Sequence, residues 1–101
     1  MDLEKAKDFL LRAQAAFKEH LLPDTLECVE YVFKYVRKHM ESEGKEFPSE
    51  LCAKASRLEE FQQFVSRMGN CWCDTINEDP EEVAFLLQTA EEMVLFATTA
   101  A

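Results

Sequence analysis

The sequence predicts an all-α fold, an antiparallel up-down four-helix bundle formed by a single domain over residues 1–101. Three observations lead to this prediction. Apolar residues recur every three to four positions through most of the chain, as in amphipathic helices. The three prolines stand near the starts of such runs, and the two glycines stand late in them or just after them. No segment alternates like a β-strand, so we expect helices at about 2–20, 24–42, 49–77 and 80–99.

The first expected helix, at 2–20, has one apolar stripe. When successive residues are placed about 100° apart, its apolar residues share one face and most of its charged residues lie elsewhere. The stripe comprises Leu3, Ala6, Phe9, Leu10, Ala13, Ala16 and Phe17. A single stripe of this kind is typical of a helix at the surface of a bundle.

The second expected helix, at 24–42, has an apolar arc about twice as wide as the ~100° that a surface helix needs. Asp24 is its expected N-cap, with Glu27 at the reciprocal capping-box position. The wide arc holds Leu26, Cys28, Val29, Tyr31, Val32, Phe33, Tyr35, Val36 and Met40. This width predicts that the helix lies either at the centre of the fold or in a contact between molecules.

The third expected helix begins near Pro48 and Ser49, after a polar connection that contains Gly44. Its stripe comprises Leu51, Ala55, Leu58, Phe61, Val65 and Met68, with Phe64 at the edge. Gly69 is a stop signal, but two large apolar residues beyond it continue the same stripe. Because an interior glycine costs only about 1 kcal/mol, we favour one helix over 49–77. The alternative is a helix that ends at Met68 and is followed by a loop.

The last expected helix, at 80–99, has the clearest start in the chain. Asp79 is an acidic N-cap, Pro80 takes the first helical position and Glu82 the third. Its core stripe comprises Val83, Leu86, Leu87, Ala90, Met93, Val94 and Ala97. Phe85 and Phe96 lie off this stripe, which leaves two aromatic rings without a place in the predicted core.

The net charge of −9 limits the classes of partner. Up to Glu41 the chain has seven basic and eight acidic residues, and from Ser42 onward it has four basic and twelve acidic residues. Such a field repels nucleic acids and anionic membranes, so we expect neither as a partner. It attracts a basic protein, although solubility alone is a simpler explanation of the acidity.

The sequence predicts a cytoplasmic location. No apolar stretch reaches the roughly 18–20 residues that cross a bilayer, and the first residues lack the basic-then-apolar order of a secretory signal. In a reducing compartment the four cysteines are expected as thiols.

Cys71 and Cys73 carry the alternative hypothesis, a thiol-redox or metal-binding protein, with Cys52 as a further thiol. Two thiols separated by one residue chelate a metal only in a loop, because on a helix they point about 200° apart. The sequence also lacks the paired CxxC spacing of zinc sites. We therefore expect no metal and no cofactor.

An enzyme is the third possibility, with a pocket at the edge that Cys28, Tyr35 and His39 share. The sequence shows no positioned carboxylate partner for the histidine and defines no pair of nucleophile and base. It has no glycine-rich phosphate loop and no Glu-x-x-His pair of a di-iron bundle. We therefore predict no catalytic residues and a protein that is not an enzyme.

The sequence has more apolar surface than one four-helix core needs, which favours the hypothesis of a protein-interaction module. Tyrosine and phenylalanine are enriched at interfaces, where they bury much area at little cost in side-chain entropy. The candidate partner-binding residues are Cys28, Tyr31, Tyr35, His39, Phe85 and Phe96. We expect a homodimer, or a complex with a basic protein, in the role of an adaptor, a small chaperone or an inhibitor of the antitoxin type.

Overall fold

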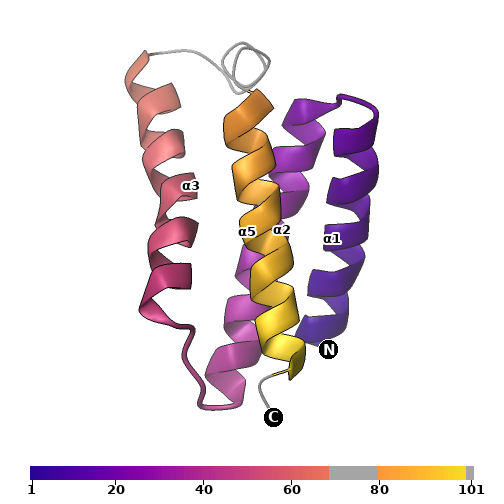
Figure 1. The fold of residues 1–101 in the computed structure, drawn as a ribbon, viewed down its shortest axis with the longest axis vertical. Helices are drawn as coiled ribbons and strands as arrows, with labels where there is room; N and C mark the ends of the chain where they lie inside the picture. Colours follow the sequence, from indigo (N-terminus) through magenta and orange to yellow (C-terminus); the bar gives the residue numbers. More distant parts are fainter. Residues whose placement is uncertain (69–79, 100–101) are drawn as a thin grey trace.

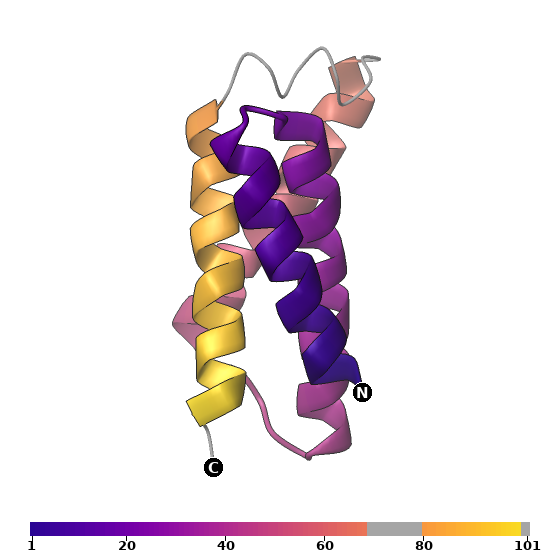
Figure 2. The same ribbon diagram turned by 90° about the vertical axis from the view of Figure 1, so that its right-hand side faces the viewer.

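The computed structural model describes residues 1–68 and 80–99 of the chain. Within these residues it contains four α-helices, which are α1 (Asp2–Lys18), α2 (Leu22–Ser42), α3 (Ser49–Met68) and α5 (Pro80–Thr99). No strand occurs among the described residues. The predicted all-α four-helix bundle is therefore confirmed. Figures 1 and 2 show the helices side by side along one long axis, with the N-terminus and the end of α5 at the same end of the bundle.

Helix α1 ends two residues before the predicted boundary because His20 leaves the helical conformation. Its φ is 60°, and Gly44, which follows α2, has a φ of 66°. After α1, the amides of His20 and Leu21 donate to the carbonyls of Phe17 and Ala16. This hydrogen-bond pattern is a Schellman motif, with His20 at the position that glycine usually occupies. The motif turns the chain into α2 within three residues.

Helix α2 begins two residues before the predicted start, so the prediction of Asp24 as N-cap is wrong. Leu21 is the N-cap, and no side chain caps this end. Pro23 stands in the first turn, where its missing N–H needs no partner. The Thr25 hydroxyl donates instead to the Leu21 carbonyl, 2.9 Å away. A second Schellman motif ends α2 at Gly44, where the amides of Gly44 and Lys45 donate hydrogen bonds to the carbonyls of residues 41 and 40.

The start of α3 at Ser49 and both ends of α5 agree with the predicted bounds. The proposed continuation of α3 through Gly69 to residue 77, and its loop alternative, lie outside the described residues.

Helix α2 lies at the centre of the core. This is one of the two positions that its wide apolar arc predicted. Most of its buried side chains come from that arc, and α2 packs against both α1 and α5. All seven residues of the predicted α5 stripe are also buried. On α1 the small residues Ala6 and Ala13 are fully buried, while the larger residues of its stripe are half-buried.

Helix α3 packs mainly on α5 and stands apart from α1, at the opposite edge of the bundle in Figure 1. Its apolar stripe is buried, apart from Phe64 at the edge, which is exposed, and Met68, whose side chain is not described. A side-chain hydrogen bond from Gln62 to Glu30 joins it to α2. The outer side of the α3–α5 contact is open to solvent, where Phe64 on α3 and Leu95 on α5 are exposed.

In the described residues, no helix combines the length and the apolar character needed to cross a membrane.

Candidate functional site

Two ion pairs join α3 to α5 on the solvent side of their contact. The Lys54 ammonium lies 3.2 Å from a Glu92 carboxylate oxygen, and the Arg57 guanidinium lies 2.9 Å from that of Glu82. The hydrogen bond and the charge of Glu82 raise the pKa of Arg57. Because Lys54 and Arg57 are three residues apart, both side chains project from one side of α3 toward α5.

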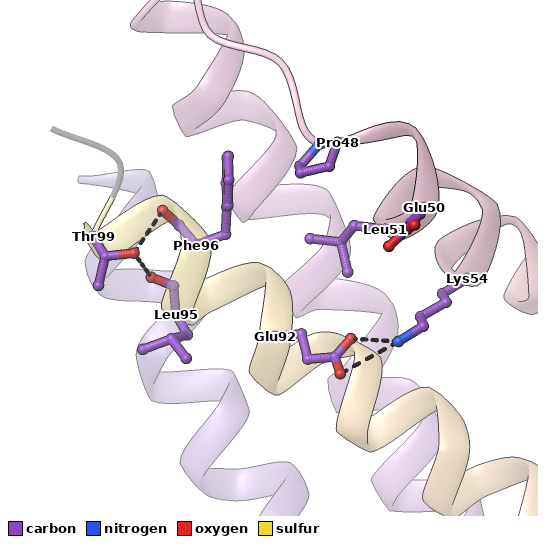
Figure 3. Close-up of a pocket in the computed structure, with 8 residues that line it drawn as sticks. All are labelled: Pro48, Glu50, Leu51, Lys54, Glu92, Leu95, Phe96 and Thr99. Atoms are coloured by element: carbon purple, nitrogen blue, oxygen red, sulfur yellow. Dashed lines mark hydrogen bonds and ion pairs between the residues drawn. The ribbon is translucent and has the colours of Figure 1, made fainter.

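The most apolar hollow along this contact is the Leu95 hollow, drawn in Figure 3. Leu51 and Phe96 point into the space between the two helices, and the Lys54–Glu92 ion pair closes one edge. The hollow has a volume of about 320 Å³ and is lined mostly by carbon. Its remaining lining residues are Pro48, Glu50, Leu95 and Thr99. A volume of this size accommodates one or two apolar side chains of a partner.

Two further hollows continue the contact toward the other end of α5. The first lies between Phe64 and Arg57, and the second between Arg57 and Phe85. Their other lining residues are Glu60, Phe61, Glu81 and Glu82. On α5, Glu81, Phe85, Glu92 and Thr99 fall within about 40° of one another around the helix. The three hollows therefore follow one face, which we call the acidic seam.

The acidic seam combines negative charge with exposed apolar side chains. Five glutamates line it against two cations, and both cations are ion-paired with α5. Phe64, Phe85 and Leu95 along it are 48%, 37% and 63% exposed. These are three of the seven large hydrophobic residues exposed in the described part of the chain. Exposed apolar groups rimmed by charge mark interaction surfaces more often than isolated exposed residues do.

A second cluster, which we call the basic face, lies on α1 and α2. The rings of Phe9, Tyr31 and Tyr35 form a stack, with centroids 4.7 Å apart between Phe9 and Tyr31 and 5.8 Å apart between Phe9 and Tyr35. The ammonium groups of Lys5, Lys34 and Lys38 lie 5.4, 5.6 and 5.9 Å from the centroid of the Tyr35 ring. Cations at these distances are attracted to the face of an aromatic ring.

The predicted partner-binding residues fall on these two surfaces rather than on one. Tyr31 and Tyr35 belong to the basic face, where their rings pack against Phe9 of α1. Phe85 and Phe96 line hollows of the acidic seam, and the Phe96 ring also packs against Phe47, with centroids 5.7 Å apart. Part of each aromatic surface that looked surplus in the sequence is thus used inside the molecule.

Cys28 and His39 are half-buried on α2, beside Tyr35 in helical spacing. Burial, and secondarily the negative charge of Glu27, raises the pKa of the Cys28 thiol. A raised pKa keeps the thiol protonated, whereas a catalytic cysteine needs its thiolate. The environment of Cys28 therefore argues against the enzymatic hypothesis for this edge.

The thiol-redox or metal hypothesis depends on Cys71 and Cys73, which lie outside the described residues. Cys28 and Cys52 are free thiols, and Cys52 is exposed. Among the described residues, no three His, Cys, Asp or Glu side chains are grouped so that they could hold a metal ion.

Most of the acidic seam is not predicted by the sequence pattern. Leu95 is exposed although its neighbours Val94 and Phe96 contribute to the core or pack against it. Phe64 was placed only at the edge of a stripe, and the pairing of Lys54 with Glu92 joins residues 38 positions apart. The available signal was an α5 with apolar residues outside its core stripe, because one buried face does not require them.

Comparison of the chain with protein-family models, with curated proteins and with solved structures gave no match in any of the three.

Proposed function

We propose that this protein is a non-enzymatic interaction module whose acidic seam binds a basic amphipathic helix of a partner protein. The observation that carries the proposal is the alignment of Phe64, Phe85 and Leu95 along a groove lined by five glutamates. Apolar side chains supply affinity when they are buried, and the carboxylates select a basic partner.

The dimensions of the acidic seam support a helix as the bound element. Phe85 and Leu95 are ten residues apart in α5, so their Cα atoms are separated by about 15 Å along the helix axis. A partner helix of about three turns spans this distance and presents an apolar stripe at spacings of three and four residues. Lysine or arginine beside that stripe would meet Glu50 and Glu81 at the two ends of the seam.

The same properties support a role as an adaptor, a small chaperone or an inhibitor, since each of these functions requires binding without chemistry. The free thiols of Cys28 and Cys52 are compatible with a cytoplasmic location, where thiols are kept reduced. The acidic charge of the chain argues against nucleic acids and anionic membranes as partners.

A synthetic peptide tests this proposal. The probe is a labelled three-turn helix with leucines at spacings of three and four residues and lysines elsewhere, and its control has the same composition in an order without a stripe. Leu95→Ser removes apolar surface from the seam, and Leu11→Ser is the matched control because Leu11, on α1, is 66% exposed. Neither substitution changes the charge of the protein.

We expect Leu95→Ser to weaken binding of the striped peptide about tenfold, the loss that corresponds to about 1.4 kcal/mol of apolar contact. Leu11→Ser should bind like the unmodified protein, and the peptide without a stripe should bind more weakly to all three. Fluorescence anisotropy measures each dissociation constant. Equal losses for the two variants would show that the peptide does not use the acidic seam.

A further inference from the structure

The basic face contains cations that the fold leaves without carboxylate partners. Within residues 1–68 and 80–99, no carboxylate lies in ion-pair distance of Lys5, Lys34 or Lys38. Because all three ammonium groups lie within 5.9 Å of the Tyr35 ring centroid, they concentrate positive charge on one small area. In a chain with nearly twice as many acidic as basic residues, such an area is a specific feature rather than an average property of the surface.

Aromatic surface accompanies this charge. Tyr31 is 37% exposed, and it stacks on Phe9 at the margin of the basic face. Its hydroxyl group and ring offer both a hydrogen bond and apolar area to a partner. The basic face therefore resembles the acidic seam in its mixture of charge and apolar area, but its charge has the opposite sign.

The basic face and the acidic seam lie on opposite sides of the bundle. Figure 1 shows α5 in front of α2, with α3 and α1 on either side of them. Tyr31, Lys34 and Lys38 lie on α2 away from the buried stripe that packs against α5. Glu81, Phe85 and Leu95 likewise lie on α5 away from its buried stripe. The two surfaces of one molecule therefore cannot contact each other.

We infer that the protein associates with copies of itself head to tail, with the basic face of one copy seated on the acidic seam of the next. The ammonium groups of Lys34 and Lys38 would lie against the glutamates of the seam, and Tyr31 would pack against Phe85 or Leu95. This inference rests on the proposed function, because the seam is the acceptor surface in both.

Electrostatics at contact distance favours this arrangement despite the net charge of −9. At physiological ionic strength, charges farther apart than about 8 Å are largely screened, so the groups that meet at the interface dominate. A contact between two different surfaces leaves one free surface of each kind at the ends of a dimer. Such heterologous contacts continue into rings or open chains, whereas a contact between identical surfaces stops at two copies.

Two variants that each lose one surface test this inference. Lys34→Ala with Lys38→Ala weakens the basic face, and Glu81→Lys with Leu95→Ser weakens the acidic seam. Lys7→Ala with Lys18→Ala is the matched control for the first variant, because it removes the same charge from exposed positions elsewhere on α1. Circular dichroism verifies that all three variants keep the helical content of the unmodified protein.

Sedimentation equilibrium from micromolar to millimolar concentration gives the masses. The unmodified protein should grow past a dimer as its concentration rises, and the Lys7/Lys18 control should associate within about twofold of it. Each single-surface variant should associate about tenfold more weakly, as expected for the loss of two contacts of about 0.5–1 kcal/mol each. The lost contacts are both charged in the lysine variant, and one charged and one apolar in the seam variant. An equimolar mixture of the two variants should form a one-to-one complex and grow no further, because each supplies the surface that the other lacks.

The inference is overturned if the unmodified protein stays monomeric, if its mass stops at a dimer, or if the mixture of folded variants forms no complex. The proposed function is separable from these outcomes. In each of them, binding of the striped basic peptide to the acidic seam would leave the proposed function standing.

Discussion

The side-chain amide of Gln62 on α3 donates a hydrogen bond to the carboxylate of Glu30 on α2. Both side chains are half-buried in the contact between the two helices. Burial raises the pKa of Glu30, the hydrogen bond from Gln62 lowers it, and the charge of Glu27 raises it slightly further. Burial is the largest of these effects, so the charged form of Glu30 is disfavoured in the folded protein.

Glu30→Gln should raise the free energy of unfolding at neutral pH, because it removes a disfavoured charge and keeps an acceptor for Gln62. A carboxyl with a raised pKa binds more protons in the folded than in the unfolded state, so its contribution to stability falls as pH rises through its titration. The advantage of the variant should therefore shrink as pH falls toward about 4.5, the ordinary pKa of glutamate. Urea denaturation of both proteins at several pH values measures the difference. A variant that is less stable at neutral pH would show that the charged hydrogen bond outweighs burial.

Gln62→Ala should destabilise the protein by about 1–2 kcal/mol, because it leaves the half-buried Glu30 carboxylate without its donor. Gln63→Ala is the control, since Gln63 is exposed one position away and should change stability by less than about 0.5 kcal/mol. Hydrogen exchange should show faster opening of α3 in the first variant. Equal exchange of α3 amides in the two variants would contradict a role for this bond in holding α3.

Substitutions at His20 and Gly44, which both have a left-handed backbone, should change the stability of the protein in opposite directions. His20→Gly should stabilise the protein by about 0.5–1 kcal/mol, because glycine adopts a positive φ without the steric cost of a side chain. Gly44→Ala should destabilise it by about 1 kcal/mol, and a Cβ at Gly44 would contact no neighbouring atom, so the backbone alone accounts for the loss. Thermal unfolding measures both changes, and a stabilising Gly44→Ala would contradict this account.

The charge of the acidic seam should affect binding of the striped basic peptide independently of apolar contact. Glu81→Lys places a cation in the seam and should weaken that binding about fivefold to tenfold, the effect of about 1 kcal/mol of repulsion. Glu4→Lys makes the same change in net charge at an exposed position on α1 and should have a smaller effect. The ratio of the two dissociation constants, measured at low and at high salt, separates local charge from net charge. Equal ratios at both salt concentrations would contradict a specific contact with Glu81.

Cys28 should react slowly with iodoacetamide at mildly alkaline pH, because its raised pKa and partial burial reduce the population of accessible thiolate. Cys52 is exposed on α3 and should be modified sooner. Mass spectrometry of peptides after brief alkylation gives the two rates. Faster modification of Cys28 would reopen the enzymatic hypothesis for the edge that it shares with Tyr35 and His39.

Helix periodicity sufficed to predict the helices and most of the core. The α5 stripe is buried as predicted, because residues at spacings of three and four must share one face of any helix. Helix ends were less accurate. Histidine is not a residue type that predicts a left-handed backbone, yet His20 has one. Asp24 is of a residue type that often caps a helix, but it lies inside α2. The backbone hydrogen bonds of the turn, rather than residue type, set both boundaries.

The sequence by itself determined that this chain forms amphipathic helices, that α2 has more apolar surface than one neighbour can cover, and that the net charge is strongly negative. Only the tertiary structure decided which of the apolar side chains outside the core pack against one another and which line the acidic seam. It stacked Tyr31 and Tyr35 on Phe9, and it aligned Leu95 with the Lys54–Glu92 ion pair in the acidic seam. The physical reason is that periodicity determines which residues share a face of one helix, whereas a groove depends on how two helices pack. That packing depends on contacts between residues far apart in the chain.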